Sequence, residues 1–330
     1  MIEVEKKPRL AVVGAGAIGG VLAWSLARAG FAPTLIARGD SARVIARDGL
    51  VLERDGVRET MRLNVVEDSA AVGQQDIVFG TMKAHDWPDS VETLLPLIGP
   101  DTALIPAING LPWWYLADSA SDRPSCVDPA GILAARIHPE NLIGCVVYMG
   151  AVRTEPGSIK WSSGRKLVLG EVVPRSTKRL VEIATVLRGA GLEIVETDEI
   201  RKEVWIKLLG NAVFNPLSVV ARATMNEMIE DTDLRPICLM AMAELIAVAA
   251  SAGITLPVTP EERLAMNAYM RNFRTSPLQD FEAGRPLELA TLIDAPCEIA
   301  ARNGIPTPVL STLGRLTARS VLMRHSGRNS

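Results

Sequence analysis

A glycine-rich segment near the start of the chain could bind a phosphate group. It fits the pattern G-x-G-x-x-G through Gly14, Ala15, Gly16, Ala17, Ile18 and Gly19. In this pattern the first glycine permits a tight turn, the second lets a pyrophosphate approach the backbone, and the third brings helix and strand together. The helix that follows would offer free N–H groups and the positive end of its dipole to phosphate. A glycine-rich turn that binds nothing is the alternative.

The end of the second expected strand bears on which dinucleotide would bind. NAD sites usually carry an acidic residue there, which holds the ribose hydroxyls. This chain has Arg38 instead, and no carboxylate before Asp40. A guanidinium can pair with a 2′-phosphate through two parallel hydrogen bonds. The sequence therefore favours NADP(H) over NAD(H), with a solvated loop charge as the alternative role of Arg38.

An enzyme that transfers hydride to a ketone needs an acid for the nascent alkoxide. No tyrosine is followed by lysine four positions later, and the chain has only three histidines. His85 is the one histidine contender, and a surface or cofactor-flanking role suits it better. No cluster of His, Cys and carboxylate residues has zinc-ligand spacing, so no metal is expected. Lysine is the acid that remains.

Lys207, Asn211 and Asn215 are spaced i, i+4 and i+8 in an expected helix, so they share one face. Asparagine is a mediocre helix former, so two at this spacing need a reason. Pro216 removes a backbone hydrogen bond and predicts a kink beside Asn215. The alternative is a solvated stripe in which Lys207 pairs with Glu203 one turn earlier.

The elements that must position these residues divide the chain into two domains. Over residues 1–197 apolar runs alternate with helical patterns, which predicts a Rossmann-type, doubly wound α/β domain with a mainly parallel sheet. The expected strands are Arg9–Val13, Thr34–Ala37, a hairpin around Asp55-Gly56, Asp76–Thr81, Thr102–Ile108, Leu142–Val152 and Lys166–Leu169. Helices are expected at Ala17–Ala29, Ala42–Asp48 and Ser176–Ala190.

Residues 198–330 are expected to form an all-helical substrate and dimerisation domain, because strand patterns disappear there. The expected helices are Glu199–Val220, Leu234–Ala252, Pro260–Phe273, Leu287–Asn303 and Pro308–Arg324. A cleft between the two domains is the natural place for the chemistry. The apolar faces of Leu234–Ala252 and Leu287–Asn303 could form a homodimer or could simply be core.

Composition excludes several classes of function. The chain has 330 residues, 48% hydrophobic and 22% charged, with a net charge of −3, so no basic field would attract nucleic acid or an anionic membrane. The apolar run Leu239–Ala252 is interrupted by Glu244 and falls short of the roughly 20 residues that a membrane span needs. Four scattered cysteines and the absence of a signal-like start predict a cytoplasmic protein.

Taken together, the motifs resemble those of the ketopantoate reductase (2-dehydropantoate 2-reductase) family over nearly the full length of the chain. The matching segments, in the family's order and with similar spacing, are Gly14–Gly19, Lys83-Ala84, Asn109-Gly110, Lys207–Leu217, Ser276–Asp280, and Glu288 ahead of Gly304–Pro308. The resemblance implies NADPH-dependent reduction of a 2-oxo acid, with 2-dehydropantoate reduced to pantoate as the leading possibility.

The resemblance also implies catalytic and substrate-binding roles. Lys207 would donate a proton to the substrate carbonyl oxygen, and Glu288 would hydrogen-bond on the side of the substrate and the lysine. The other residues implied to contact substrate are Asn109, Asn211, Asn215 and Ser276. Simpler roles stay open, since Ser276 could cap a helix and Glu288 could be a carboxylate favoured by a helix dipole.

On the cofactor side, the resemblance implies that Arg38 and Lys83 approach the adenosine phosphate end of NADPH. Asn109 would lie against the nicotinamide half. An ordinary lysine at a strand end is the alternative for Lys83.

The chain departs from the family pattern at three places. Ile108 stands where the family often has glutamine, residues 113–140 are longer than expected, and Ala290 replaces a second acidic residue. The aromatic run Trp113–Tyr115 could form a lid over the cleft or anchor the insertion. A pocket altered in this way could accept another 2-oxo acid or a bulkier ketone. A related 2-hydroxy-acid or opine-type dehydrogenase and a non-catalytic NADP(H)-sensing protein remain the alternatives.

Overall fold

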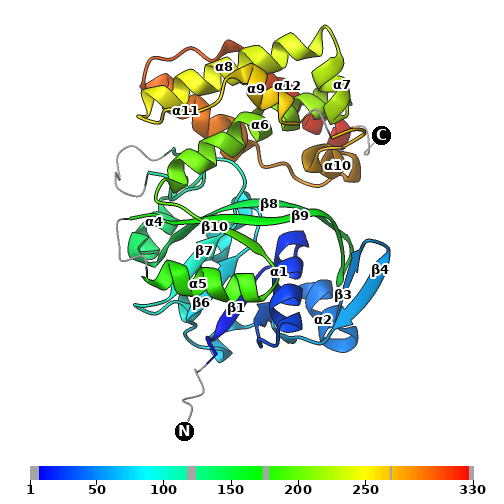
Figure 1. Cartoon of the computed structure of the whole chain (residues 1–330), viewed down its shortest axis with the longest axis vertical. Coiled ribbons are helices and arrows are strands. Elements are labelled where there is room, and N and C mark those ends of the chain that lie inside the picture. Colours follow the sequence, from blue (N-terminus) through cyan, green and yellow to red (C-terminus); the bar gives the residue numbers. More distant parts are fainter. Residues whose placement is uncertain (1–6, 117–123, 174–177, 268–269, 327–330) are drawn as a thin grey trace. The chain divides into compact units, whose positions relative to one another are not determined.

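The computed structural model describes residues 7–116, 124–173, 178–267 and 270–326, and it divides into two compact units (Figure 1). The first unit holds the chain up to Ile108 together with Gly131–Ile200. The second holds Asn109–Tyr115, the described part of Asp122–Ala130, and the chain from Arg201 onwards. The division therefore falls after Ile200, close to the expected residue 197, but two earlier segments join the second unit.

The first unit is built on a five-stranded parallel sheet in the order β5-β2-β1-β6-β7. Its strands are β1 (Leu10–Val13), β2 (Thr34–Ile36), β5 (Asn64–Val66), β6 (Ile77–Gly80) and β7 (Ala103–Pro106). Every residue of β1, β2, β6 and β7 is buried, as expected for a parallel sheet covered on both faces. The predicted α/β class is confirmed.

A second sheet in the same unit was not predicted. It runs β10-β9-β3-β4, with β8 also paired to β9. Its strands are β3 (Leu50–Arg54), β4 (Val57–Met61), β8 (Ile143–Glu155), β9 (Ser158–Glu171) and β10 (Glu193–Glu196). The β3–β4 hairpin turns at Asp55-Gly56, as predicted, with positive φ at both residues. β3 then pairs in parallel with β9, about a hundred residues away in sequence.

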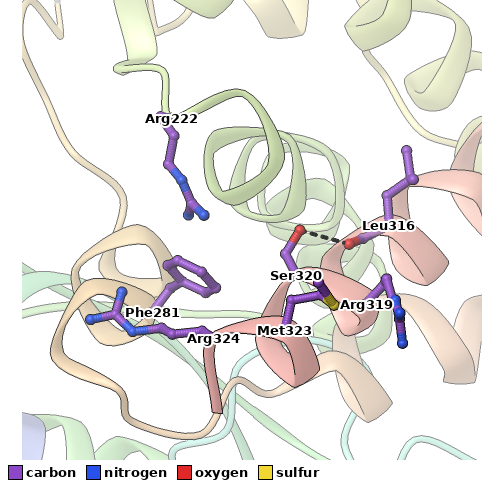
Figure 2. A pocket seen from close by; sticks show the side chains of 7 residues that line it. All are labelled: Arg222, Phe281, Leu316, Arg319, Ser320, Met323 and Arg324. Atoms are coloured by element: carbon purple, nitrogen blue, oxygen red, sulfur yellow. Dashed lines mark hydrogen bonds between the residues drawn. The ribbon is translucent and has the colours of Figure 1, made fainter. Parts of the chain in front are cut away.

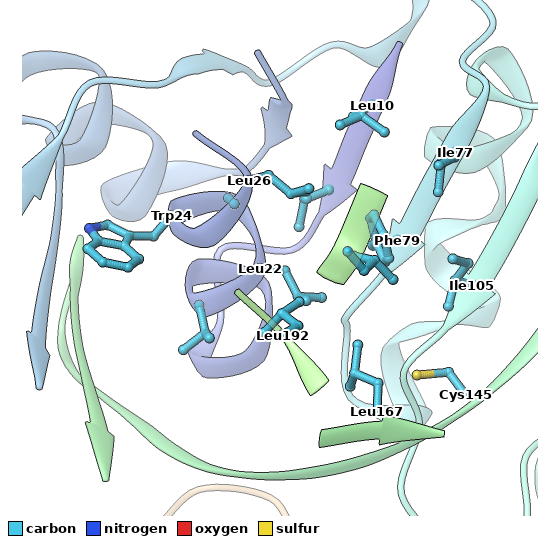
Figure 3. Packing of buried hydrophobic residues seen from close by; sticks show 14 of the residues in the cluster. Leu10, Leu22, Trp24, Leu26, Ile77, Phe79, Ile105, Cys145, Leu167 and Leu192 are labelled. Carbon is cyan, nitrogen blue, oxygen red and sulfur yellow. The ribbon is translucent and has the colours of Figure 1, made fainter. Parts of the chain in front are cut away.

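Helix α1 (Ala17–Arg28) packs against strands of both sheets, including β1, β3, β8 and β9. Figure 3 shows Leu22 and Leu26 of this helix among side chains from β1, β6, β7 and β9. Gly20 permits the close approach to β9, because a Cβ there would lie 2.7 Å from the Ile159 side chain. The other helices of the unit are α2 (Gly39–Asp48), α3 (Val91–Leu94), α4 (Ile132–Arg136) and α5 (Lys178–Gly189). Short 3₁₀ turns lie at Ser69–Ala71, Ala84–Asp86, Pro88–Ser90, Leu95–Leu97 and Pro139–Asn141.

The second unit contains helices and no strand among its described residues. The helices are α6 (Ile200–Ala221), α7 (Met225–Glu230), α8 (Leu234–Ser251), α9 (Pro260–Ala265), α10 (Ser276–Ala283), α11 (Ala295–Arg302) and α12 (Pro308–Ser326). The helices α7 and α10 were not predicted, and α9 ends well before the expected Phe273. The expected helix Leu287–Asn303 is helical over 289–302, with a π-helical stretch at Ala290–Asp294 that runs directly into α11.

Two helices of this unit are long and apolar enough to cross a membrane, by length and composition alone. Core helices of globular proteins pass the same test, and the most apolar stretch of α6 is 72% buried inside the structure. The corresponding stretch of α8 is only 33% buried. α6 is therefore a core helix, whereas α8 carries an exposed apolar face.

Candidate functional site

The glycine loop of the first unit has the geometry of a phosphate cradle. Gly14 has φ of +104°, and the Thr81 hydroxyl lies 2.9 Å from the Gly14 carbonyl oxygen, to which it can donate. A Cβ on Gly19 would lie 2.0 Å from that same oxygen, so only glycine fits there. A Cβ on Gly16 would meet no atom within 4 Å, so open space faces this residue. Gly16 also begins α1 without a side-chain cap, which leaves helix N–H groups to a ligand.

Arg38 and Lys83 both follow strands of the parallel sheet at its carboxyl edge, where such sheets bind ligands. Arg38 comes after β2 and donates a hydrogen bond to the hydroxyl of Thr93, so its guanidinium is anchored although the residue is exposed. Lys83 comes after β6, is half-buried and leads into the 3₁₀ turn Ala84–Asp86. The residues suggested for cofactor binding in this unit thus stand near one edge of one sheet.

In the second unit, α6 carries the polar face that the sequence predicted. Lys207 Nζ donates a hydrogen bond of 2.6 Å to Asn109 Oδ1. Lys207 and Asn211 are half-buried, and Asn215 is only 9% exposed. The alternative of a solvated stripe is therefore wrong. The helix continues through Pro216, whose carbonyl accepts a hydrogen bond from the hydroxyl of Thr317.

The segment that carries Asn109 is fastened to the π-helical turn at Ala290–Asp294. The Leu111 N–H donates to the Thr291 carbonyl at 2.8 Å. Between Asn109 and Leu111, Gly110 has φ of +84°, and a Cβ there would lie 2.4 Å from the Thr291 carbonyl oxygen. Backbone therefore packs directly on backbone at this point, which only glycine allows. π-turns inside helices occur often at functional sites.

The aromatic run Trp113–Tyr115 anchors its segment, which is the second of the two roles expected for it, and does not form an exposed lid. Trp113, Trp114 and Tyr115 are each at most 3% exposed. The Trp205 indole N–H donates to the Tyr115 hydroxyl, and the two rings meet edge to face with centroids 6.1 Å apart. Arg201 Nε donates to the Tyr115 carbonyl at 2.9 Å, and burial raises the pKa of Tyr115 to about 12. Arg201 and Trp205 lie on α6, the same helix as Lys207, so both ends of the segment are tied to that helix.

The remaining expected site residues lie at two helix beginnings. Thr275 caps α10 by accepting from the Leu278 N–H, so the cap is not Ser276, which is the exposed first residue of the helix. Glu288 is half-buried and directly precedes the helical turn whose Leu292 N–H bonds to its carbonyl. The alternative that Ser276 serves as a helix cap is therefore wrong.

Comparison with known proteins decides the family. The model of ketopantoate reductase PanE/ApbA matches residues 10–174, and its C-terminal counterpart matches residues 199–320. A 2-dehydropantoate 2-reductase from Mesorhizobium japonicum is 33% identical over 96% of this chain and 98% of its own length. The chain belongs to the ketopantoate reductase family. It is an oxidoreductase of that family, and the resemblance seen in the sequence is confirmed.

Solved structures of similar proteins agree with the fold. The 2-dehydropantoate 2-reductase of Geobacter metallireducens GS-15 superimposes with a TM-score of 0.84 at 28% identity, over 94% of this chain and 99% of its own. A D-mandelate dehydrogenase bound to NADH and anilino(oxo)acetate has a TM-score of 0.83 at 21% identity, over 95% of this chain and 98% of its own. The second likeness concerns the fold alone.

Sequence reasoning missed residues that hold the candidate site around Lys207 in place. Gly110 was noted only as part of a matching dipeptide, and neither Thr291 nor Trp205 was singled out. A glycine directly after a polar candidate was the available signal for Gly110. No local signal marks the Thr291 carbonyl, because its role depends on a π-turn that brings together residues far apart in the chain.

Proposed function

We propose that the protein reduces a 2-oxo acid, with 2-dehydropantoate as the leading substrate, and uses NADPH and Lys207 as the proton donor. The observation that carries this proposal is the 2.6 Å hydrogen bond between Lys207 Nζ and Asn109 Oδ1. A half-buried ammonium aimed by a fixed amide is suited to meet an oxygen on which negative charge develops. The glycine loop and Arg38 support NADP(H), since one fits a pyrophosphate and the other offers a guanidinium for a 2′-phosphate.

The cofactor, when bound, supplies the hydride that goes to the ketone carbon. The residues of this chain act at the ketone oxygen. Lys207 stabilises the growing negative charge there and delivers the proton from Nζ. Asn109 accepts from Lys207 and so fixes the direction of one of its three N–H bonds. In this proposal Glu288 keeps the ammonium oriented, while Asn211, Asn215 and Ser276 bind the hydroxyl and carboxylate of the substrate.

The test is turnover of the Lys207→Ala variant, followed as loss of NADPH absorbance with 2-dehydropantoate. We expect kcat to fall by about 10²–10⁴-fold, the range for removal of a general acid. NADPH affinity, measured by fluorescence titration, should stay the same. Lys202→Ala on the same helix is the matched control and should keep wild-type turnover. Unchanged turnover in Lys207→Ala would remove this lysine from the mechanism.

The substrate panel also separates the alternatives. Ala290 stands where the family usually has an acidic residue, and it is the first residue of the π-turn. This difference favours, as the second candidate, a substrate other than 2-dehydropantoate. Phenylglyoxylate, an aryl 2-oxo acid, is the comparison compound. Faster turnover of phenylglyoxylate would support a related 2-hydroxy-acid dehydrogenase. Tight NADPH binding without turnover of any 2-oxo acid would support a sensor.

A homodimer through α8 is part of the proposal. Five exposed apolar positions of this helix share one face, and they are Pro236, Met240, Ala243, Ala247 and Ala250; the polar residues Arg235 and Ser251 are exposed as well. Met240 is 49% exposed and is the largest apolar side chain on this face. Sedimentation of the wild type should give a dimer, and Met240→Glu should shift it toward monomer. The four free cysteines support a reducing, cytoplasmic setting.

A further inference from the structure

A pocket of about 470 Å³ lies in the second unit, away from Lys207. Figure 2 shows the side chains that line it, which come from the end of α6, from α10 and from α12. They are Arg222, Phe281, Leu316, Arg319, Ser320, Met323 and Arg324. It is a hollow open to solvent, since its lining residues Leu316 and Met323 are 48% and 56% exposed. Lys207 lies fourteen residues before the end of α6 at Ala221, or roughly 20 Å along the helix, so a small ligand in this pocket would not reach it.

The lining is strongly cationic. It contains three arginines and no acidic residue. The nearest acidic residues in sequence are Asp280 and Glu282, on either side of Phe281. Their carboxylates pair with Arg285 and Arg274, neither of which lines the pocket. A pocket lined by positive charge without a facing carboxylate favours an anionic ligand over a neutral or cationic one.

Two of the arginines are held in place by an aromatic ring. The guanidinium carbon of Arg222 lies 3.9 Å from the centroid of Phe281, and that of Arg324 lies 4.9 Å from it. Figure 2 shows Arg222 above the ring and Arg324 below it. Arg324 also donates to the Glu282 carbonyl, so its position does not depend on a ligand. Guanidiniums fixed in advance lose little side-chain entropy when they bind an anion.

The fold also keeps two features here that do not favour its own stability. Arg222 has φ of +57°, a conformation that glycine would adopt without strain. The Nε of Arg324 is buried without a hydrogen-bond partner among the described residues, so this atom does not itself face the pocket. Local backbone strain of the kind seen at Arg222 occurs often at ligand sites. A glycine at position 222 would adopt this φ without strain. The presence of arginine there indicates that its guanidinium has a role.

We propose that this pocket binds a small organic phosphate. Guanidinium forks match phosphate oxygens, which accounts for the arginines. Phe281, Leu316 and Met323 give the same pocket an apolar side, and inorganic phosphate would leave that side uncovered. The ligand is therefore a phosphate ester with an apolar or planar body. This site is separate from the one proposed for the reaction and does not depend on it.

Phenyl phosphate is the probe, and binding to the full-length protein is measured by isothermal titration calorimetry with NADPH present at saturation. We expect saturable binding that is tighter than that of inorganic phosphate or benzoate and that weakens as salt rises. Arg222→Gly and Arg324→Gln should each weaken it by about 10-fold or more, as expected for loss of a hydrogen bond to a charged group. Arg315→Gln, an exposed arginine of α12 outside the pocket, is the matched control and should bind like wild type.

Arg222→Gly separates a ligand site from a purely structural contact. Loss of the contact with Phe281 alone would lower thermal stability, whereas relief of the positive φ works in the opposite direction. We expect Tm to stay level or rise while phenyl phosphate binding falls. The proposal is overturned if wild type shows no saturable binding, if all variants bind equally, or if saturating NADPH abolishes binding, since the probe would then occupy the cofactor site.

Discussion

Replacement of Gly110 by alanine is the sharpest test of how the site is held together. The new Cβ would lie 2.4 Å from the Thr291 carbonyl oxygen and 2.5 Å from its carbon, and neither backbone atom can rotate away. The positive φ of 84° adds about 1 kcal/mol of strain for any residue with a side chain. Separation of the two backbones would also lengthen the hydrogen bond from Leu111, worth about 1 kcal/mol. We expect a loss of about 2–3 kcal/mol in stability.

Gly304→Ala is the matched control. Gly304 belongs to the same unit and has φ of +69°, but a Cβ there would meet no atom within 4 Å. The Gly304→Ala variant therefore measures the cost of backbone strain alone, about 1 kcal/mol of stability. Differential scanning calorimetry should place the Tm of Gly110→Ala below that of Gly304→Ala by several degrees, at about 2–4 °C for each further kcal/mol.

The same substitution should affect catalysis through Asn109. A shift of about 1 Å in a positioning group can lower turnover by about 10²-fold. We therefore expect Gly110→Ala to lose turnover while Gly304→Ala keeps it, with NADPH affinity equal in both. Equal Tm values and equal turnover in the two variants would refute the reasoning that the backbone contact at Thr291 positions the amide.

Three further outcomes follow from other contacts. Arg38→Gln should raise KM for NADPH by about 10-fold or more and leave KM for NADH unchanged, because only NADPH carries the 2′-phosphate; equal changes would exclude that role. Burial raises the pKa of Tyr115 to about 12, so this phenol contributes stability that is present below its unfolded pKa near 10 and is lost as pH rises toward 12. Tyr115→Phe should flatten the fall in Tm over that interval, and an unchanged slope would contradict this. Burial acts to raise the pKa of Glu298, but hydrogen bonds from the N–H groups of Ser125 and Cys126 outweigh it and lower that pKa. The Glu298 carboxylate therefore contributes stability above its unfolded pKa of about 4.3, and this stability is lost as pH falls through the folded pKa. Glu298→Gln should have a lower Tm than wild type at pH 7, and the two Tm values should converge near pH 3.

Local patterns were enough for the parallel sheet and the long helices. β1, α1 and the loop between them were predicted nearly to the residue, because a buried apolar run, three glycines and a helical period follow one another directly. The hairpin at Asp55-Gly56 was also predicted, since that dipeptide favours positive φ at both positions. The spacing of Lys207, Asn211 and Asn215 correctly indicated a shared and partly buried face.

Contacts between distant segments could not be predicted in this way. Nothing in Leu50–Arg54 indicates that it pairs with Ser158–Lys160, so the second sheet was missed. The π-turn at Ala290–Asp294 lies within an ordinary helical period and runs into α11, near whose start Pro296 stands. The helix α10 has eight residues, too few for a clear period.

The assignment of Asn109–Tyr115 to the helical unit limits how the protein can be divided into fragments. A fragment that begins at Arg201 would carry every long helix and still lack a piece of its own interior. Its Trp205 indole N–H would lose the Tyr115 hydroxyl, and its Thr291 carbonyl would lose the Leu111 N–H. The helical unit is therefore not complete when it begins at Arg201, and a chimaera must carry these seven residues together with the helices that they contact.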